Sequence, residues 1–408
     1  MRTPLSLAAS PKMRRRALVM VVNAANSLVL PLVSPLFSFL VIRLASVELW
    51  GEFVRVLALA QFGTHVVMWG NKDYLLREFS QNPAHLAQAW QTSLITRLAL
   101  FTAFAAALAG LGVPPLRLLW LIFMSLAIVL DQAYDVFVLY KRDFAYSIFV
   151  ELCGLALLAF PVISVRHTLR LDGLIILFGV SNLSKAGLFL WRFRRHTAGL
   201  GAGRFDLNHL RLAFPFFLLG FSGLMQSRID LYIISLLLSR KEIGQYQVFT
   251  NLIICAQSVS GFVLVPFAKN LYRLSYSAIL KISVRLFGLG LITAAAALPA
   301  IHLALTALYH IELSPVFLVW GALFVWPIYF YLPIIYALFK ADQLMAVILI
   351  NFAGMGVTLG LSLLLLPRLG MLGAVAASAA TQWLMLAAYL LQGRSLRDEP
   401  AAIVSELS

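Results

Sequence analysis

The stretch "QSRIDLYIISLLL", residues 226–238, places an arginine and an aspartate inside an otherwise apolar segment. Apolar segments of about 20 residues recur along the chain, and each is long enough to cross the ~30 Å hydrocarbon core of a membrane as a helix. The 408-residue sequence is 61% hydrophobic and 12% charged, whereas soluble domains are about half apolar and a quarter charged. The sequence therefore predicts an all-α polytopic membrane protein. The alternating segments of about ten residues that build a transmembrane β-barrel are absent.

We expect about twelve transmembrane helices, joined by loops too short to form an extramembrane domain. The basic N-terminal segment is followed by an apolar run too long for a cleaved signal peptide, so it reads as a signal-anchor that becomes the first span. The expected spans are residues 17–43, 50–71, 89–110, 116–140, 144–164, 171–192, 211–239, 243–268, 280–308, 315–339, 343–366 and 371–392.

The basic residues set the expected orientation. With the N-terminus in the cytoplasm, about 21 of the 32 Lys and Arg fall on cytoplasmic segments, as the positive-inside rule requires. Both termini are then cytoplasmic in a multi-pass protein. The net charge of +15 is spread over these short loops rather than gathered in a basic stripe, so we expect no nucleic-acid partner.

Three short patterns recur in order along the chain, and each occupies the same place in its half. The pairs are "LWGEF" (49–53) with "EIGQY" (242–246), "YKRD" (140–143) with "FKAD" (339–342), and "LDG" (171–173) with "MLG" (371–373). They predict two six-helix lobes, 1–200 and 201–408, joined by a glycine-rich linker. Because each lobe has an even number of spans, the lobes keep the same orientation and are related by a pseudo-two-fold axis along the membrane normal.

The charges of Arg228 and Asp230 are costly in a membrane. A charge at the centre of a spanning helix costs ~2.5–3.5 kcal/mol, whereas a leucine or isoleucine returns only ~0.3–0.6 kcal/mol. The helix therefore needs water, a partner charge or a ligand on its inner side. On a helical wheel Gln226 and Asp230 share one face and Arg228 lies on the other side, so the sequence leaves open whether the two charges share neighbours.

Other ionisable side chains lie at membrane depth. Each has a structural alternative: Arg55, Asp135 and Lys185 lie near enough to an interface to extend towards it, and Asp131 and Glu151 can pair with basic residues of the first lobe. Intramembrane ionisable groups are otherwise functional-site candidates. Those considered are Arg55, Arg97, Asp131, Asp135, Glu151 and Lys185.

A hydrated cavity lined with arginines would attract a phosphate-like anion, because the guanidinium is always charged and offers a fork of donors. We expect Arg228, Arg97, Arg55, Asp230 and Gln226 to line such a substrate cavity. Carboxylates are candidates for coupling transport to H⁺ or Na⁺, namely Asp131, Asp135 and Glu151. Neither catalytic motifs nor Cys/His metal clusters occur in the sequence, so we expect no catalytic residues, no metal and no cofactor.

Three longer stretches resemble polysaccharide exporters of the multidrug/oligosaccharidyl-lipid/polysaccharide (MOP) superfamily. They are "ELWGEFVRVLALAQFGTHVVMWGNKDYLLREFS" (48–80), "RIDLYIISLLLSRKEIGQYQVFTNLI" (228–253) and "LGMLGAVAASAATQWL" (369–384). The resemblance implies a MATE-like fold and a flippase for an undecaprenyl-pyrophosphate-linked oligosaccharide, of the O-antigen or exopolysaccharide type, in the bacterial inner membrane. It also places Arg228 and Asp230 at the central cavity.

The expected partners are the lipid-linked oligosaccharide, membrane lipids and other polysaccharide-assembly proteins, and we expect a monomer. A second interpretation is a cation-coupled exporter of small molecules or drugs on the same fold. A third is a membrane-embedded glycan polymerase or ligase, although such enzymes usually carry a large external loop or an acidic catalytic motif, and this chain has neither.

Overall fold

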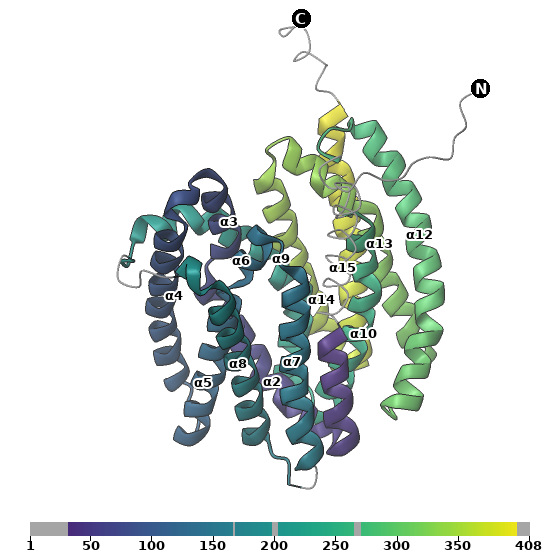
Figure 1. Ribbon diagram of the computed structural model, residues 1–408. Coiled ribbons are helices and arrows are strands. Elements are labelled where there is room, and N and C mark those ends of the chain that lie inside the picture. The colour runs from purple at the N-terminus through teal and green to yellow at the C-terminus, as the bar shows by residue number, and fades with distance from the viewer. Residues whose placement is uncertain (1–31, 166–167, 198–202, 265–270, 398–408) are drawn as a thin grey trace, which may run out of the picture.

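The computed structural model describes residues 32–165, 168–197, 203–264 and 271–397 (Figure 1). All regular structure in these ranges is helical. Eleven helices there are long and apolar enough to cross a membrane, and they are accompanied by the shorter apolar helix Leu32–Leu44. The chain is thus a multi-pass membrane protein. The first expected span, 17–43, begins outside the described residues.

The helix boundaries follow the sequence closely. α7 matches its expected span residue for residue, and α5 and α13 begin with Pro115 and Pro315, whose fixed φ suits the first helical turn. The helices are α2 (Val47–Met68), α3 (Asn71–Gln81), α4 (Leu86–Ala109), α5 (Pro115–Gln132), α6 (Asp135–Lys141), α7 (Phe144–Ser164), α8 (Leu171–Thr197), α9 (Leu207–Leu237), α10 (Arg240–Leu264), α12 (Tyr276–Leu303), α13 (Pro315–Lys340), α14 (Leu344–Leu369) and α15 (Met371–Arg394).

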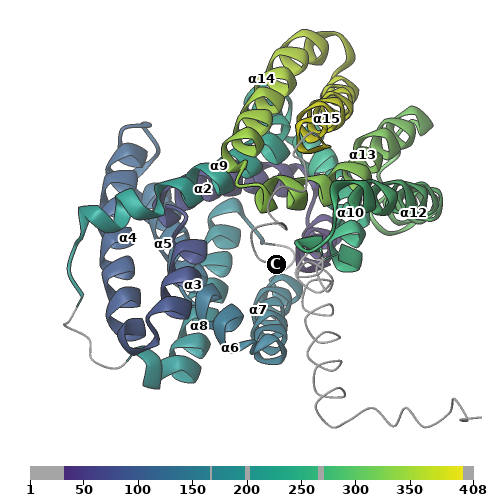
Figure 2. The same ribbon diagram turned by 90° about the horizontal axis from the view of Figure 1, so that it is seen from above.

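The helices form two groups when seen from above (Figure 2). In the first group, α8 packs against α5 and α7, and α5 also contacts α2. In the second group, α15 packs against α13 and α14, while α9 lies along α14. The groups meet where α2 packs against α9 and α10. The largest cluster of buried apolar side chains continues across this meeting line, from Trp50 of α2 to Tyr246 of α10 and Tyr329 of α13.

Three helix pairs begin 200 residues apart, namely α5 and α13, α7 and α14, and α8 and α15. The turn before α7 and the turn before α14 also share one hydrogen-bond pattern: the Asp143 amide donates to Val138 O (3.0 Å) and the Gln343 amide to Leu338 O (2.9 Å). Arg142 and Asp342 have left-handed φ values of 57° and 54°. The sequence match of "YKRD" with "FKAD" implies an offset of 199 residues, whereas the backbone of the turn repeats at 200. The difference arises because the match compared side chains and not backbone conformation.

The two groups touch most closely at the end where α2 and α10 begin. A Cβ on Gly51 would lie 1.7 Å from the carbonyl oxygen of Arg240, and one on Gly244 would lie 2.4 Å from that of Val47. The helices are therefore in main-chain contact, and we call this contact the glycine seam (Gly51 and Gly244). These glycines are the pair that the repeat "LWGEF"/"EIGQY" matches.

Polar contacts tie the two groups together around the glycine seam. Trp50 Nε1 donates to Gln247 Oε1 (3.0 Å). Asn251 Nδ2 donates to Ser34 Oγ of the helix Leu32–Leu44 (2.8 Å). Tyr309 donates its hydroxyl to Pro35 O (2.6 Å). These contacts hold the two groups together at this end, which we call the closed end.

Candidate functional site

A cavity of ≈ 570 Å³ lies within the second helix group, between α9, α10, α13, α14 and α15. Arg228 is the one charged side chain among the described lining residues. The polar remainder of the described lining is Gln226, Ser227, Gln257, Ser258, Ser260, Tyr331, Asn351, Gln382 and Tyr389. The cavity therefore combines one cation with amides, hydroxyls and aromatic rings.

Arg228 stands at the border of two cavities. It also lines a space of ≈ 180 Å³ between the groups, together with Gln61 of α2 and Asn251 of α10. Its guanidinium makes no hydrogen bond or ion pair with any residue in the described ranges. Since an arginine carries five N–H donors, they are available to a ligand that enters either cavity.

Asp230 lines neither of these two cavities. Its carboxylate accepts hydrogen bonds from the Tyr246 hydroxyl of α10, from Ser378 Oγ of α15 (3.2 Å) and from the Leu231 amide (2.7 Å). The residue is only 7% exposed. Arg228 and Asp230 therefore face different neighbours: Asp230 fastens α9 to α10 and α15, and this fixes the rotation of α9 that turns Arg228 towards the cavities.

Hydrogen bonds between neighbouring helices hold the polar wall of the larger cavity. Tyr331 donates to Gln382 Oε1 (2.6 Å), and Tyr389 donates to Asn351 Oδ1 (3.0 Å). The two tyrosine rings are stacked with their centroids 5.1 Å apart. Gln226 lies beside this wall and makes no side-chain hydrogen bond with a described residue. Its amide and the Arg228 guanidinium can thus face the same ligand.

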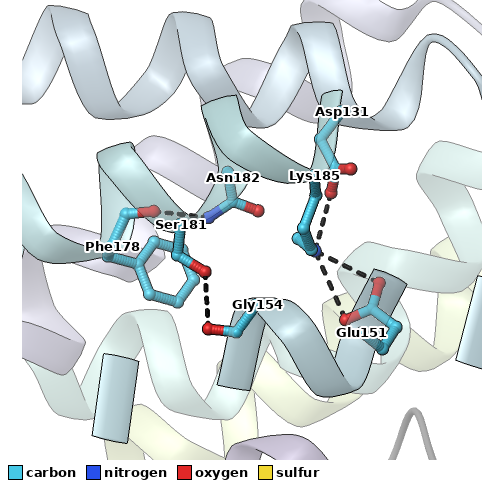
Figure 3. Close-up of polar contacts among 7 residues, drawn as sticks. All are labelled: Asp131, Glu151, Gly154, Phe178, Ser181, Asn182 and Lys185. Atoms are coloured by element: carbon cyan, nitrogen blue, oxygen red, sulfur yellow. Dashed lines mark hydrogen bonds and ion pairs between the residues drawn. The ribbon is translucent and has the colours of Figure 1, made fainter. Parts of the chain in front are cut away.

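A cluster of charges lies within three candidate membrane-spanning segments of the first helix group (Figure 3). Lys185 Nζ of α8 is 2.7 Å from Asp131 Oδ2 of α5 and 3.1 Å from Glu151 Oε1 of α7. We call these three residues the Lys185 cluster. It confirms the structural pairing that the sequence left open for Asp131 and Glu151, and Lys185 does not extend to an interface. Asp131 Oδ1 is buried without a described hydrogen-bond partner.

The Lys185 cluster and the larger cavity occupy matching places in the two groups. At the 200-residue spacing, Asp131, Glu151 and Lys185 correspond to three cavity-lining residues. Those residues are Tyr331, Asn351 and Met385. The glycines beneath also correspond: a Cβ on Gly154 would lie 2.8 Å from Lys185 Cδ, and one on Gly354 would lie 2.8 Å from Met385 Sδ. One group fills this position with charge, and the other leaves it hollow and neutral.

The remaining predicted site residues lie elsewhere. Arg97 is 1% exposed, and its Nε and Nη1 atoms have no described partner. Arg55 donates from Nε to Ser235 O (2.6 Å), which joins α2 to α9. Asp135 opens α6 and forms no ion pair within the described ranges. Neither arginine nor Asp135 lines the two cavities at Arg228, so of the expected set the structure brings together Arg228 and Gln226 there.

Sequence reasoning did not identify the aromatic part of the wall. Tyr331 and Tyr389 lie in apolar, aromatic-rich helices, where a tyrosine resembles a core residue. The sequence does indicate the amide part of the wall. Gln257, Asn351 and Gln382 are uncharged polar residues within apolar segments of the second half of the chain.

No protein-family model and no curated protein matches this chain. Its fold does match solved structures. The inward closed conformation of the lipid II flippase MurJ aligns over 93% of this chain and 87% of its own, with a TM-score of 0.63 and 10% identity. The MATE multidrug transporter DinF-BH aligns over 96% of both chains, with a TM-score of 0.65 and 13% identity.

A third match is the inward-facing conformation of a multidrug resistance MATE family transporter of the MOP superfamily. It covers 94% of this chain and 96% of its own, with a TM-score of 0.50 and 14% identity. At these identities the likeness shows the fold alone. The expected MATE-like fold is thereby confirmed.

Proposed function

We propose that this chain, which has the fold of MurJ and MATE transporters, is a flippase of the MOP superfamily. Its proposed cargo is an undecaprenyl-pyrophosphate-linked oligosaccharide, of the O-antigen or exopolysaccharide type, which it moves across the bacterial inner membrane by alternating access. The observation that carries the proposal is Arg228: an unpaired guanidinium in a cavity whose described lining is otherwise neutral. One structural neighbour is a flippase of lipid II.

The cavity suits the head of such a lipid chemically. A guanidinium binds phosphate oxygens through two parallel N–H donors, and the described lining holds no carboxylate that competes for Arg228. Gln226 and Gln257 offer amide groups to sugar hydroxyls. The Tyr331 and Tyr389 hydroxyls are engaged with Gln382 and Asn351, and they hold the wall in place. The polyprenyl tail would stay in lipid between the helix groups.

The same observation weakens the alternatives. A cationic drug would meet Arg228 without an opposing carboxylate in the described lining, and like charges that lie close together in a partly dry site repel strongly. A polymerase or ligase would need a general acid or base at the reacting bond, and the described lining of the cavity holds no carboxylate and no histidine. Transport of an anionic head group therefore fits the cavity better.

The Lys185 cluster is the place where we propose that a coupling ion acts. Two carboxylates share one ammonium there, which leaves one negative charge when all three are ionised. A buried net charge is costly, so H⁺ or Na⁺ that reaches the cluster would be held. Asp131 offers Oδ1, which has no described partner, as the point of attachment.

Replacing Arg228 tests the cargo site. We expect Arg228→Gln to lower the translocation of a lipid-pyrophosphate oligosaccharide in proteoliposomes at least a hundredfold, because two charge-assisted hydrogen bonds of ~1.5–3 kcal/mol each are lost. Arg228→Lys keeps the positive charge but not the forked pair of N–H donors. Its translocation rate should lie between those of Arg228→Gln and the unaltered protein. The matched control is Arg211→Gln, an exposed arginine of the same helix, which should translocate as the unaltered protein does.

Two results would contradict the proposal. One is normal translocation by a folded Arg228→Gln variant, which would remove Arg228 from the site. The other is transport of a cationic dye that the lipid pyrophosphate does not inhibit, which would favour the drug exporter.

A further inference from the structure

A second, strongly basic pocket lies apart from the cavities at Arg228. It has a volume of ≈ 620 Å³ and is formed by the turn between α6 and α7 and by the end of α8. Five cations and one carboxylate line it: Lys141, Arg142, Arg192, Arg194, Arg195 and Asp143. We call it the basic pocket.

The charges of the basic pocket are mostly unpaired. Asp143 pairs with Arg192 (2.8 Å), and the other four cations form no ion pair with any residue of the described ranges. Lys141, Arg142, Arg194 and Arg195 are exposed, while Phe193 forms an apolar floor that is 3% exposed. The pocket therefore has exposed cations around a buried apolar floor.

The depth of the basic pocket can be inferred from the length of α8. Its 27 residues span about 40 Å at 1.5 Å per residue, which exceeds the ~30 Å of the hydrocarbon core. The last turns, which carry Arg192 to Arg195, therefore reach the level of the lipid head groups. Trp191, 61% exposed, precedes them, and tryptophan is typical of the membrane interface.

The second helix group shows that the fold does not require these charges. At the 200-residue spacing, the ion pair of Asp143 and Arg192 is replaced by a hydrogen bond from Gln392 Nε2 to Gln343 Oε1 (2.9 Å). The positions of Lys141, Arg142 and Arg195 hold Ala341, Asp342 and Ser395. Of the five cations, only that of Arg194 has a counterpart in the second group, namely Arg394. The same turn and helix end thus form without the other four.

The backbone at Arg142 supports the same conclusion. Its φ of 57° lies in the left-handed region, which glycine and asparagine adopt more readily than an arginine does. An arginine at this position adds charge to the pocket and does nothing for the turn.

We propose that the basic pocket binds the phosphate group of an anionic membrane phospholipid. Basic pockets between spanning helices suit such head groups, and the four unpaired cations exceed the one or two negative charges of a head group that has one or two phosphodiesters. The acyl chains would lie against the exposed apolar surface beside the pocket, which includes Trp191 and Leu190. The inference does not depend on the proposed cargo.

The test uses the full chain, purified in an uncharged detergent, and counts bound lipids by native mass spectrometry. The probes are phosphatidylglycerol, cardiolipin and phosphatidylcholine, with inorganic phosphate as competitor. The variant Lys141→Ala/Arg142→Asn/Arg195→Ser imitates the second group. The control removes three exposed cations elsewhere, as Arg77→Gln/Lys281→Ala/Arg285→Gln.

We expect the affinity of the control for each anionic lipid to lie within twofold of that of the unaltered chain. Both proteins should bind phosphatidylcholine at least tenfold more weakly than the anionic lipids. The basic-pocket variant should bind the anionic lipids at least tenfold more weakly. Equal losses in both variants, or equal binding of phosphatidylcholine, would overturn the site. Competition by millimolar inorganic phosphate would overturn the lipid assignment. If the triple variant does not fold, Arg142→Asn alone should weaken binding about threefold, and an unchanged affinity would refute the proposal.

Discussion

Arg228 and Asp230 are two residues apart, yet they have opposite surroundings. Successive residues of a helix point about 100° apart, so the sequence places Gln226 and Asp230 on one face and Arg228 on another. The structure instead groups Gln226 with Arg228 at the larger cavity and leaves Asp230 outside it. The sequence shows that both charges are costly in lipid. It does not show which neighbours receive them, because that depends on how α10 and α15 pack against α9 and supply the Tyr246 and Ser378 hydroxyls.

The hydrogen bond to Asp230 makes a testable contribution to stability. Tyr246→Phe removes the hydroxyl donor from a carboxylate that is 7% exposed, and the free energy of unfolding should fall by about 1.5–3 kcal/mol. The measurement is thermal or denaturant unfolding of the purified protein. Tyr232→Phe is the control, because the Tyr232 hydroxyl makes no hydrogen bond with a described residue. Equal stability of the two variants would show that Asp230 does not depend on this donor.

At the scale of the element, helix ends were the most predictable feature and side-chain partners the least. Prolines, apolar run lengths and charged turns indicate where α5, α7, α8 and α13 begin. The Lys185 cluster joins three helices that are distant in sequence, so no local pattern selects Lys185 as the partner of Asp131 and Glu151. The sequence indicates which residues can form ion pairs. The packing of α8 against α5 and α7 determines that Lys185 pairs with Asp131 and Glu151.

Removing the ammonium from the Lys185 cluster should destabilise the first helix group. Lys185→Met introduces the residue found at the matching position of α15 and leaves two carboxylates unpaired at membrane depth. Breaking a buried pair in this way costs about 3–5 kcal/mol. The checks are unfolding of the purified variant and its yield in the membrane.

The rescue variant separates charge from packing. Lys185→Met combined with Asp131→Asn and Glu151→Gln removes all three charges and should recover most of the lost stability. A triple variant as unstable as Lys185→Met would mean that the lysine acts through its packing on Gly154 rather than through its charge.

At the scale of the whole molecule, the internal repeat is the main link between sequence and structure. The expected lobes, 1–200 and 201–408, remain a prediction, since the segment 198–202 lies outside the described residues. The sequence predicted a cavity at Arg228. It did not predict that matching positions hold a charge cluster in one group and a cavity in the other, because size and shape of a cavity follow from three-dimensional packing.

Alternating access requires that the closed end opens during transport. Ser34 Oγ and Asn251 Nδ2 are 2.8 Å apart beside the glycine seam. In a background with Cys153 and Cys255 replaced by serine, Ser34→Cys/Asn251→Cys should cross-link under mild oxidation. We expect transport in proteoliposomes to stop and to return on reduction, while either single cysteine has no effect. Transport that continues at full rate through a complete cross-link would contradict alternating access at this end.

The glycine seam has a kinetic consequence. Where side chains interdigitate, parting and rejoining two helices requires each rotamer to be found again. At Gly51 and Gly244 the main chains of the two helices are in direct contact. Glycine has no side chain, so no rotamer must be recovered at these two positions when the helices meet again. At the glycine seam itself the two helices can therefore separate and dock again without a search for rotamers.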